Sequence, residues 1–296
     1  MNFLRRILLK VFMTGENPLQ LSEQVLTVDS DRGFRISFDV QKNITSDPNT
    51  ATIQVYNLAP STRDALSSRG KWVELYAGYV DDVKMVYAGQ ISTFSIRKGG
   101  EDLVSVIVCK TDWDFQKKIY RNAFIENTSL KSIIINILKT FKIPYSPQHI
   151  LVNGDAGERG WGFSDNIKNI FDNLANWFNF SWSMQDYGFL AIDDKMVLPT
   201  NINLESHVLD VSPIPKEDDR TSVGYELNCV LNAGFQVGYN VVFSSKYYPK
   251  NDFKIFRLSH SGDSHDNQWT TSLMGYKAGS LVIKPKPGYF EEEPQT

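Results

Sequence analysis

The sequence predicts a mainly β protein with a small α+β insertion, in which two strand-rich zones flank a helix-containing module. The period of the apolar residues is the first observation: it is two over residues 19–113, helical over residues 114–204, and two again over residues 205–284. The second is length, because 296 residues are enough for two or three domains with cores of their own.

The chain begins with a basic and apolar segment, residues 1–18, which we expect to form an amphipathic arm. Leu4, Ile7, Leu8, Val11 and Phe12 would share one side of a helix. Lys10 interrupts the apolar stretch, which argues against a signal peptide, and the stretch is too short to span a bilayer. Docking of the arm on a partner is favoured over binding to a membrane surface.

The first zone, residues 19–113, is predicted to be a single antiparallel barrel or sandwich. Phe34, Ile36, Phe38 and Val40 alternate with polar residues, as a half-buried strand requires. Further strands are predicted at residues 50–58, 71–79, 83–89, 91–99 and 102–110.

Glycines and one short helix punctuate this zone. Gly78 and Gly89 are expected to mark turns, and the Gly99-Gly100 pair a tight hairpin. A helix is predicted to begin at Ser61 as its N-cap and to stop at Gly70.

The middle module, residues 114–204, contains two predicted helices and a hairpin. One helix begins after Thr128 or Ser129 and ends before Pro144, and its apolar stripe is Leu130, Ile133, Ile134, Ile137, Leu138 and Phe141. The other follows a Ser164-Asp165 cap, with a stripe of Ile167, Ile170, Phe171, Leu174 and Phe178. Residues 180–194 then form the hairpin, with its turn at residues 186–188.

The second strand zone, residues 205–284, is expected to form a second barrel. Its strands are predicted at residues 222–231, 236–245, 253–261 and 268–276. The polar segment 213–219 is expected to be a loop, and residues 285–296 an extended tail.

Charge and cysteine content exclude two classes of protein. A net charge of −3 and a pI near 5.9 argue against a nucleic-acid-coating surface, which needs a concentrated basic face. Cys109 and Cys229 are far apart in apolar, strand-like runs, so we expect reduced core residues and no zinc or redox site.

One segment could hold a metal ion, because His260, Asp263 and His265 fall within six positions. Turn residues surround them, however, and residues 253–276 read as strand, turn and strand. We therefore expect His260 at the end of one strand, His265 at the tip, and His260 and Asp263 to set the turn.

Other candidate chemistry is weak. Ser261 is flanked by Gly262 but lacks the G-x-S-x-G pattern of a nucleophile elbow. The glycine-rich segment 154–162 lacks a phosphate-loop lysine, so we expect it to be a flexible loop. The acidic pairs at residues 81–82, 193–194 and 218–219 are expected to be solvated, and most tryptophans to be buried in cores or interfaces. We predict no catalytic, cofactor-binding or metal-binding residue and no enzyme, and we favour a structural role.

Several segments together resemble one family, the central baseplate hub proteins of tailed bacteriophages and related injection machines. Residues 34–43, 51–66, 73–79 and 86–94 are similar to the first barrel of that family. Residues 127–141 resemble the first helix of its middle module, and residues 180–194 the closing hairpin. Residues 231–243 and 253–275 are similar to its second barrel.

The resemblance implies two tail-tube-like barrels in each chain, at residues 19–113 and 205–284. It implies a homotrimer whose pseudo-sixfold ring joins a hexameric tail tube or distal tail protein to a trimeric spike or fibre, and DNA that only passes through. Other baseplate proteins and the tape measure protein are further implied partners. The protein would be assembled in the host cytoplasm and reside in the virion tail, without stable membrane insertion.

Two expectations accompany this resemblance. Edge strands should pair between subunits. The inner face of the ring should be enriched in acidic and small polar side chains, and a markedly basic face would contradict this. Two alternatives stay open: a tail-associated enzyme that degrades cell walls, and a carbohydrate-binding receptor module.

Overall fold

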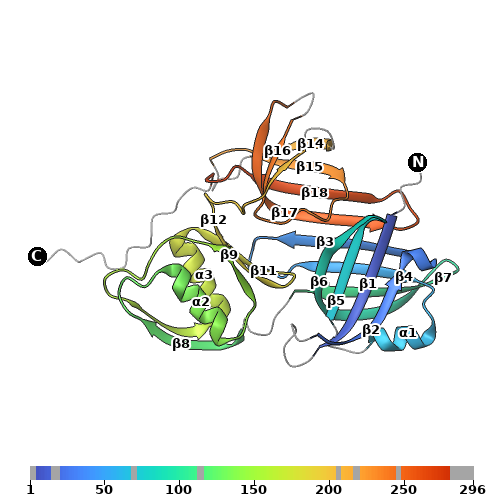
Figure 1. Cartoon of the computed structure of the whole chain (residues 1–296), viewed down its shortest axis with the longest axis horizontal. Coiled ribbons are helices and arrows are strands. Elements are labelled where there is room, and N and C mark those ends of the chain that lie inside the picture. Colours follow the sequence, from blue (N-terminus) through green and yellow to red (C-terminus); the bar gives the residue numbers. More distant parts are fainter. Residues whose placement is uncertain are drawn as a thin grey trace, which may run out of the picture.

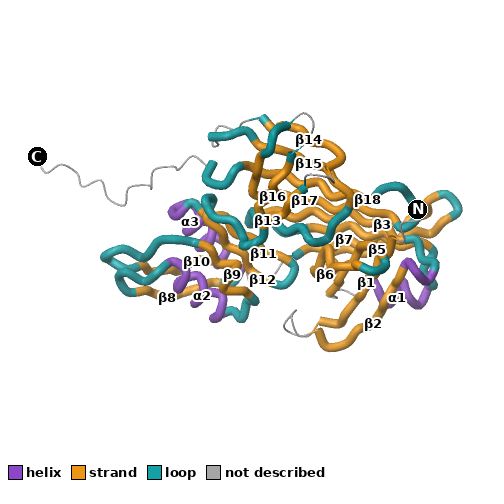
Figure 2. The backbone as a smooth tube through the Cα atoms, turned by 45° about the horizontal axis from the view of Figure 1, so that its top comes forward, coloured by secondary structure: helices purple, strands orange, loops and turns teal. Residues whose placement is uncertain are grey.

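The computed structural model of the chain describes residues 5–14, 21–67, 72–111, 117–204, 208–215, 221–244 and 248–280. The molecule has three parts, which we call the first lobe, the middle module and the second lobe (Figure 1). The two lobes are built mainly of strands, with one short helix in the first lobe, and the helices α2 and α3 lie together in the middle module (Figure 2). This confirms the predicted class, mainly β with an α+β insertion.

The first lobe contains residues 5–111. Its elements are β1 (Arg5–Thr14), β2 (Leu21–Asp29), the 3-10 turn η1 (Ser30–Arg32), β3 (Ile36–Asn43), β4 (Thr50–Tyr56), α1 (Pro60–Ser67), β5 (Trp72–Tyr79), β6 (Asp82–Gly99) and β7 (Asp102–Lys110).

The middle module and the second lobe follow in chain order. The module comprises β8 (Ile119–Phe124), α2 (Leu130–Thr140), β9 (Tyr145–Leu151), β10 (Trp161–Asn166), α3 (Ile167–Phe178), β11 (Phe180–Gln185) and β12 (Gly188–Asp193). The second lobe comprises β13 (Asn201–Asn203), β14 (Val208–Ile214), β15 (Gly224–Val230), β16 (Asn240–Phe243), β17 (Asn251–Asp263) and β18 (Trp269–Tyr276).

The two lobes share one 13-stranded sheet. Its main path runs β14-β15-β18-β17-β3-β4-β7-β6-β5-β1-β2, with β16 and β13 attached beside β17. The β17–β3 pair joins the lobes, with His260 opposite Val40 and Ser261 opposite Asp39. All pairs in this sheet are antiparallel except β13 with β16. The two strand zones are therefore continuous through backbone hydrogen bonds.

Strand β6 corrects the prediction of two strands with a turn at Gly89. Its first half pairs with β5 as far as Gln90, and its second half pairs with β7 from Gln90 to Gly99. Gly89 lies inside the strand, where a Cβ atom would come within 2.9 Å of the carbonyl oxygen of Lys110. The glycine permits close approach of two strands. Gly78 likewise lies within β5, whereas Gly100 does form the predicted hairpin turn, with φ 67°.

The predicted helical arm is wrong for the residues that the structure describes. Residues 5–14 form β1, which pairs with both β2 and β5. Ile7, Leu9 and Val11 are fully buried at a spacing of two, so the period that matters is that of a strand. The apolar residues of this segment fit the spacing of a helix as well as that of a strand. Pairing with β5 decides in favour of the strand. Residues 1–4 and 15–18 of the arm lie outside the described residues.

Helix boundaries agree in the main with prediction. Helix α2 has the predicted cap, since Ser129 accepts a hydrogen bond from the backbone N–H of Ser132. Helix α1 begins at Pro60, before the predicted cap, because proline suits the first turn of a helix. Helix α3 is capped by Asn166, two residues after Ser164, because β10 extends up to it. The predicted stop at Gly70 lies outside the described residues.

Each of the three parts has its own apolar core. The first lobe packs β1, β3, β4, β5 and β7 around residues such as Ile53 and Val73, and the second lobe packs around Phe243 and Phe253. The module packs α2 and α3 against β11 and β12. Cys109 and Cys229 are free and buried, as predicted. The domain boundaries that we inferred from sequence remain a prediction.

Two further segments bear on the prediction of loops. Pro213 and Ile214 end strand β14, so the polar segment 213–219 begins as strand. Residues 216–220 and the tail from residue 281 onward lie outside the described residues. No helix within the described ranges is long and apolar enough to cross a membrane.

Candidate functional site

The hairpin of β17 and β18 separates the three residues that could have held a metal ion. His260 lies within β17, buried, with its Nδ1 2.8 Å from the hydroxyl of Thr271. Asp263 accepts from Arg35, with Oδ2 2.8 Å from Nη2, and from the backbone N–H of His265 at 2.8 Å. His265 is exposed at the tip. Asp263 therefore sets the turn as predicted, whereas His260 belongs to the strand.

Burial governs the protonation of His260. Desolvation, with a smaller contribution from the nearby Lys42 charge, lowers its pKa from 6.5 to about 3. The imidazole is therefore neutral across the physiological range. Its Nε2 finds no hydrogen-bond partner among the described residues. Within those residues no group of three or more histidine, cysteine and acidic side chains is arranged to hold a metal ion.

The other candidates take structural positions. The hydroxyl of Ser261 lies 3.2 Å from that of Thr270, across the strand pair. Asp82 pairs with Lys84, and Asp193 accepts from the backbone N–H of Lys195. The pair 218–219 lies outside the described residues. Trp72, Trp182 and Trp269 are buried, as predicted for core tryptophans.

Sequence reasoning missed a polar junction between the first lobe and the middle module. The β11–β12 turn inserts Asp186, whose carboxylate lies 2.5 Å from Lys42 Nζ and accepts from the backbone N–H of Ala88. These two side chains are only 6% and 17% exposed. Tyr187, next in the turn, accepts from the Trp72 indole at 3.2 Å and donates to Glu74. One feature of the sequence could have indicated this junction: Lys42 is a charged residue at a core-facing position of a strand, where it needs a partner.

The same hairpin also contacts the first lobe through amides. Asn49 is fully buried and donates to the carbonyl of Met184 at 3.1 Å and to the side chain of Gln185 at 3.0 Å. Gln185 donates in turn to the carbonyl of Asn43 at 2.9 Å. The module is therefore attached by side-chain hydrogen bonds that only one orientation satisfies.

The principal surface feature is a layer of eight strands with two open edges. The layer runs β14-β15-β18-β17 in the second lobe and β3-β4-β7-β6 in the first. Within the part of the chain that the structure describes, β14 pairs only with β15, and residues 91–99 of β6 pair only with β7. Exposed apolar side chains lie on both edges, Leu209 at 62% and Ile96 at 47%. Such edges are templates for pairing with another chain.

The face of this layer opposite the cores is mainly small and polar. Strand register and alternation place on it the side chains of Gln41, Thr50, Thr52, Gln54, Thr93, Ser95, Ser212, Asn228, Ser259, Ser261, Thr270 and Ser272. Asp39, Asp210 and Glu226 share this face with Arg97, Lys110 and Arg257. Acidic and basic side chains therefore balance along it.

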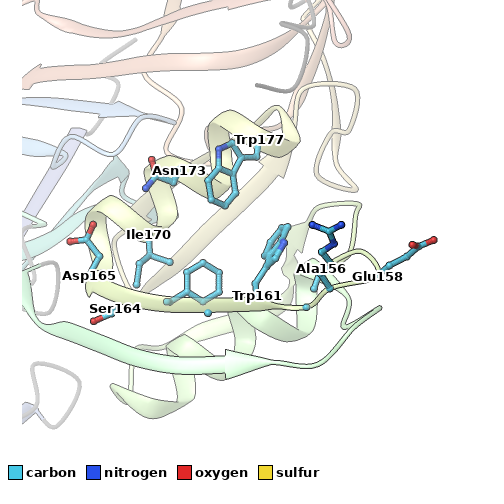
Figure 3. Close-up of a pocket in the computed structure, with 12 residues that line it drawn as sticks. Ala156, Glu158, Trp161, Ser164, Asp165, Ile170, Asn173 and Trp177 are labelled. Carbon is cyan, nitrogen blue, oxygen red and sulfur yellow. The ribbon is translucent and has the colours of Figure 1, made fainter. Parts of the chain in front are cut away.

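The middle module holds an aromatic pocket of about 890 Å³ between β10 and α3. Trp161 of β10 and Trp177 of α3 both line it and contact each other edge to face, with ring centroids 5.6 Å apart (Figure 3). Phe163 and Ile170 complete its apolar wall, and its polar lining includes Asn173, Asp165, Glu158 and Arg159. The glycine-rich segment 154–162, which the sequence predicts to be a flexible loop, therefore also contributes side chains to a pocket.

Comparison with known proteins gives a family and a fold. The family model described as baseplate hub gp41 matches residues 8–275. No curated protein matches the chain. The fold is similar to that of the 43 kDa tail protein of prophage MuSo2 from Shewanella oneidensis, with a TM-score of 0.61, 10% identity, and coverage of 95% of this chain and 100% of that chain.

Two other solved structures share the fold. A tail protein from Neisseria meningitidis MC58 has a TM-score of 0.61 at 9% identity, covering 94% of this chain and 98% of its own. The E. coli c3393 protein, described as a type VI secretion component similar to T4 tail proteins gp27 and gp5, has a TM-score of 0.55 at 11% identity. That match covers 84% of this chain and 77% of the other.

Proposed function

The chain belongs to the baseplate hub gp41 family, and from that premise we propose that three copies close into a pseudo-sixfold ring around the channel of a phage tail. As a member of this family the protein is a structural component of the virion tail. The ring would join a hexameric tail tube or distal tail protein on one side to a trimeric spike or fibre on the other.

The eight-stranded layer is the observation that carries this proposal. Each lobe supplies four strands to it, so a ring of three chains would present six similar units to a hexameric neighbour. The open edges of β14 and of residues 91–99 in β6 lie at opposite ends of the layer. Pairing β14 of one copy with β6 of the next would close the ring and leave neither edge exposed.

The composition of the face of the eight-stranded layer that lies opposite the cores supports our proposal that this face lines the channel. Small hydroxyl and amide side chains offer no fixed positive charge that would hold passing DNA. With this face toward the channel, its small polar side chains agree with the expected composition of the inner face, whereas its acidic and basic residues balance and give no acidic excess. We therefore propose a nearly neutral channel lining, through which DNA passes without stable binding.

Function in this account is geometric and needs no catalytic group. The free energy of assembly would be distributed over large interfaces with the tube, the spike, other baseplate proteins and the tape measure protein. Assembly would take place in the host cytoplasm before the tail is complete.

Disulfide trapping tests the ring directly. The native cysteines are both buried, which keeps their background reactivity low. Chains carrying Ser212→Cys on β14 together with Ser95→Cys on β6 should oxidise into covalent dimers and trimers, with no larger species. A matched control pairs Ser212→Cys with Ser272→Cys, which lies on the interior strand β18 and should stay monomeric. Equal cross-linking of both pairs would contradict the proposed edges.

A further inference from the structure

We infer that the aromatic pocket of the middle module is a binding site for a lysine-proline segment, and that its occupant is residues 284–287 of the same chain. This inference is independent of the ring. It depends on the chemistry of the pocket, on where the chain leaves the described structure, and on the residues that follow.

The pocket has the features of a groove that recognises an extended proline-containing segment. Trp161, Trp177 and Phe163 form an aromatic cluster in its lining, and proline rings in the extended polyproline conformation pack well on aromatic side chains. That conformation is already favoured before binding, so little ordering entropy is lost. Asn173 is exposed on α3 and lines the pocket, so its side-chain amide can form a hydrogen bond with the backbone of such a segment.

The sequence beyond Ser280 matches this groove in composition and charge. Residues 284–287 read Lys-Pro-Lys-Pro, and Tyr289 and Phe290 follow. The charged side chains that line the pocket are Glu158, Asp165 and Arg159, so its lining is negative by one charge and complements a segment with two lysines.

The chain leaves the described structure close to the pocket. The backbone N–H of Gly279 donates to the carbonyl of Asp194 at 3.0 Å, and the N–H of Asp194 donates to the carbonyl of Asn179 at 3.4 Å. Asn179 is the C-cap of α3, two residues after Trp177. The buried Ser280 is thus anchored beside the end of the helix that forms one wall.

The chain beyond Ser280 is long enough to reach the pocket. Pro285 and Pro287 are five and seven residues beyond Ser280, a span of roughly 16 to 23 Å for an extended chain. Asn173 lies six residues back from Asn179, about 9 Å along the helix. The same chain can therefore fill its own pocket, at an effective concentration in the millimolar range.

Disulfide formation within the full-length chain tests the inference. We would combine Lys286→Cys with Asn173→Cys, which lines the pocket, and compare it with Lys286→Cys plus Asn176→Cys. Both asparagines are exposed on α3, but Asn176 does not line the pocket and lies nearer the anchored Ser280. A docked segment should give at least fivefold more intrachain bond with Asn173→Cys at low protein concentration. A segment that samples space at random should favour Asn176→Cys.

A second variant separates docking from folding defects. Pro285→Ala with Pro287→Ala, added to the Lys286→Cys and Asn173→Cys chain, should reduce the bond to the level of the control. Circular dichroism and thermal unfolding of each variant should match the parent, because the changes lie at exposed positions or beyond Ser280. Three results would overturn the inference: equal yields for the two asparagine positions, no effect of the prolines, or a bond that forms only between chains.

Discussion

The first lobe has two neighbours, and it is joined to them by different physical means. Its junction with the second lobe is a strand pair, β3 with β17, made of backbone hydrogen bonds. Its junction with the middle module is made by side chains around the β11–β12 turn, chiefly Lys42 with Asp186 and Tyr187 with Glu74 and Trp72. The first depends on strand geometry and tolerates many sequences, whereas the second depends on particular residues.

The difference fits the roles that we propose for the two parts. A channel wall needs an uninterrupted sheet, and backbone pairing provides one whatever faces the channel. A module attached by a few satisfied polar groups is fixed in one orientation, because any other would leave a buried charge unpaired. Substitutions should therefore act on the two junctions by different rules.

The largest effect is expected from proline at the sheet junction. Ser261 lies opposite Asp39 on β3 and Thr270 on β18, so Ser261→Pro removes a donor from an interior strand. We expect a loss of about 3 kcal/mol or more in the free energy of unfolding, measured with urea. Ser261→Ala is the matched control and should change this free energy by less than about 0.5 kcal/mol, because only a hydroxyl contact is lost. Similar losses for the two variants would refute the backbone account.

At the module junction a single side chain should matter nearly as much. Lys42→Met leaves Asp186 without its cation in a site that is largely buried, and should cost about 3 kcal/mol. Adding Asp186→Asn should recover part of this, because the amide oxygen still accepts from Ala88. Urea unfolding of the wild type, both single variants and the double variant measures the coupling. Strict additivity would contradict a direct pair.

The sheet junction should also respond to pH through His260. Its pKa of about 3 in the folded chain lies below the ordinary 6.5, so from pH 6.5 downward the unfolded chain binds a proton that the folded chain does not. Stability should fall as the pH falls through this window. Between pH 6.5 and 5 we expect wild type to lose about 1.5 kcal/mol more than His260→Gln. Parallel pH profiles for the two proteins would show that His260 does not govern this response.

The smallest effect concerns the Tyr187 hydroxyl. Tyr187→Phe keeps the ring against Trp72, with centroids 5.6 Å apart, and removes only the hydrogen bonds to Trp72 and Glu74. The expected loss is about 1 kcal/mol by thermal or urea unfolding. Trp72→Phe with Tyr187→Phe should lose more than Tyr187→Phe alone, because Trp72 is fully buried and the smaller ring leaves a cavity.

The sequence predicts local elements well and long-range partners poorly. The alternation from Ile36 to Val40 and the stripe from Leu130 to Leu138 each determine one face, and both elements are confirmed. The segment from Arg5 to Thr14 satisfies two periods at once, and only its pairing with β5 makes it a strand. Gly89 has the composition of a turn, but it serves as a contact point between strands, which depends on Lys110 far along the chain.

In the candidate site, too, the local features could be predicted from the sequence and the long-range partners could not. That His260 and Asp263 belong to a hairpin follows from the turn residues between them and Trp269, so the metal hypothesis could be set aside from sequence. The open edges could not be located from sequence, since an exposed residue such as Ile96 looks the same beside water or a partner. Lys42 and Asp186 are separated by more than a hundred residues, and their pairing required the fold.

The most direct test of the trimeric ring is the native mass of the full-length protein in solution, measured by light scattering over a range of concentrations. We expect a species of three times 33.7 kDa, formed through the edges of β14 and β6. Leu209→Lys with Ile96→Lys, which places like charges on both edges, should shift that species toward monomer while circular dichroism stays unchanged. A stable dimer, or a monomer at every concentration, would contradict the ring of three.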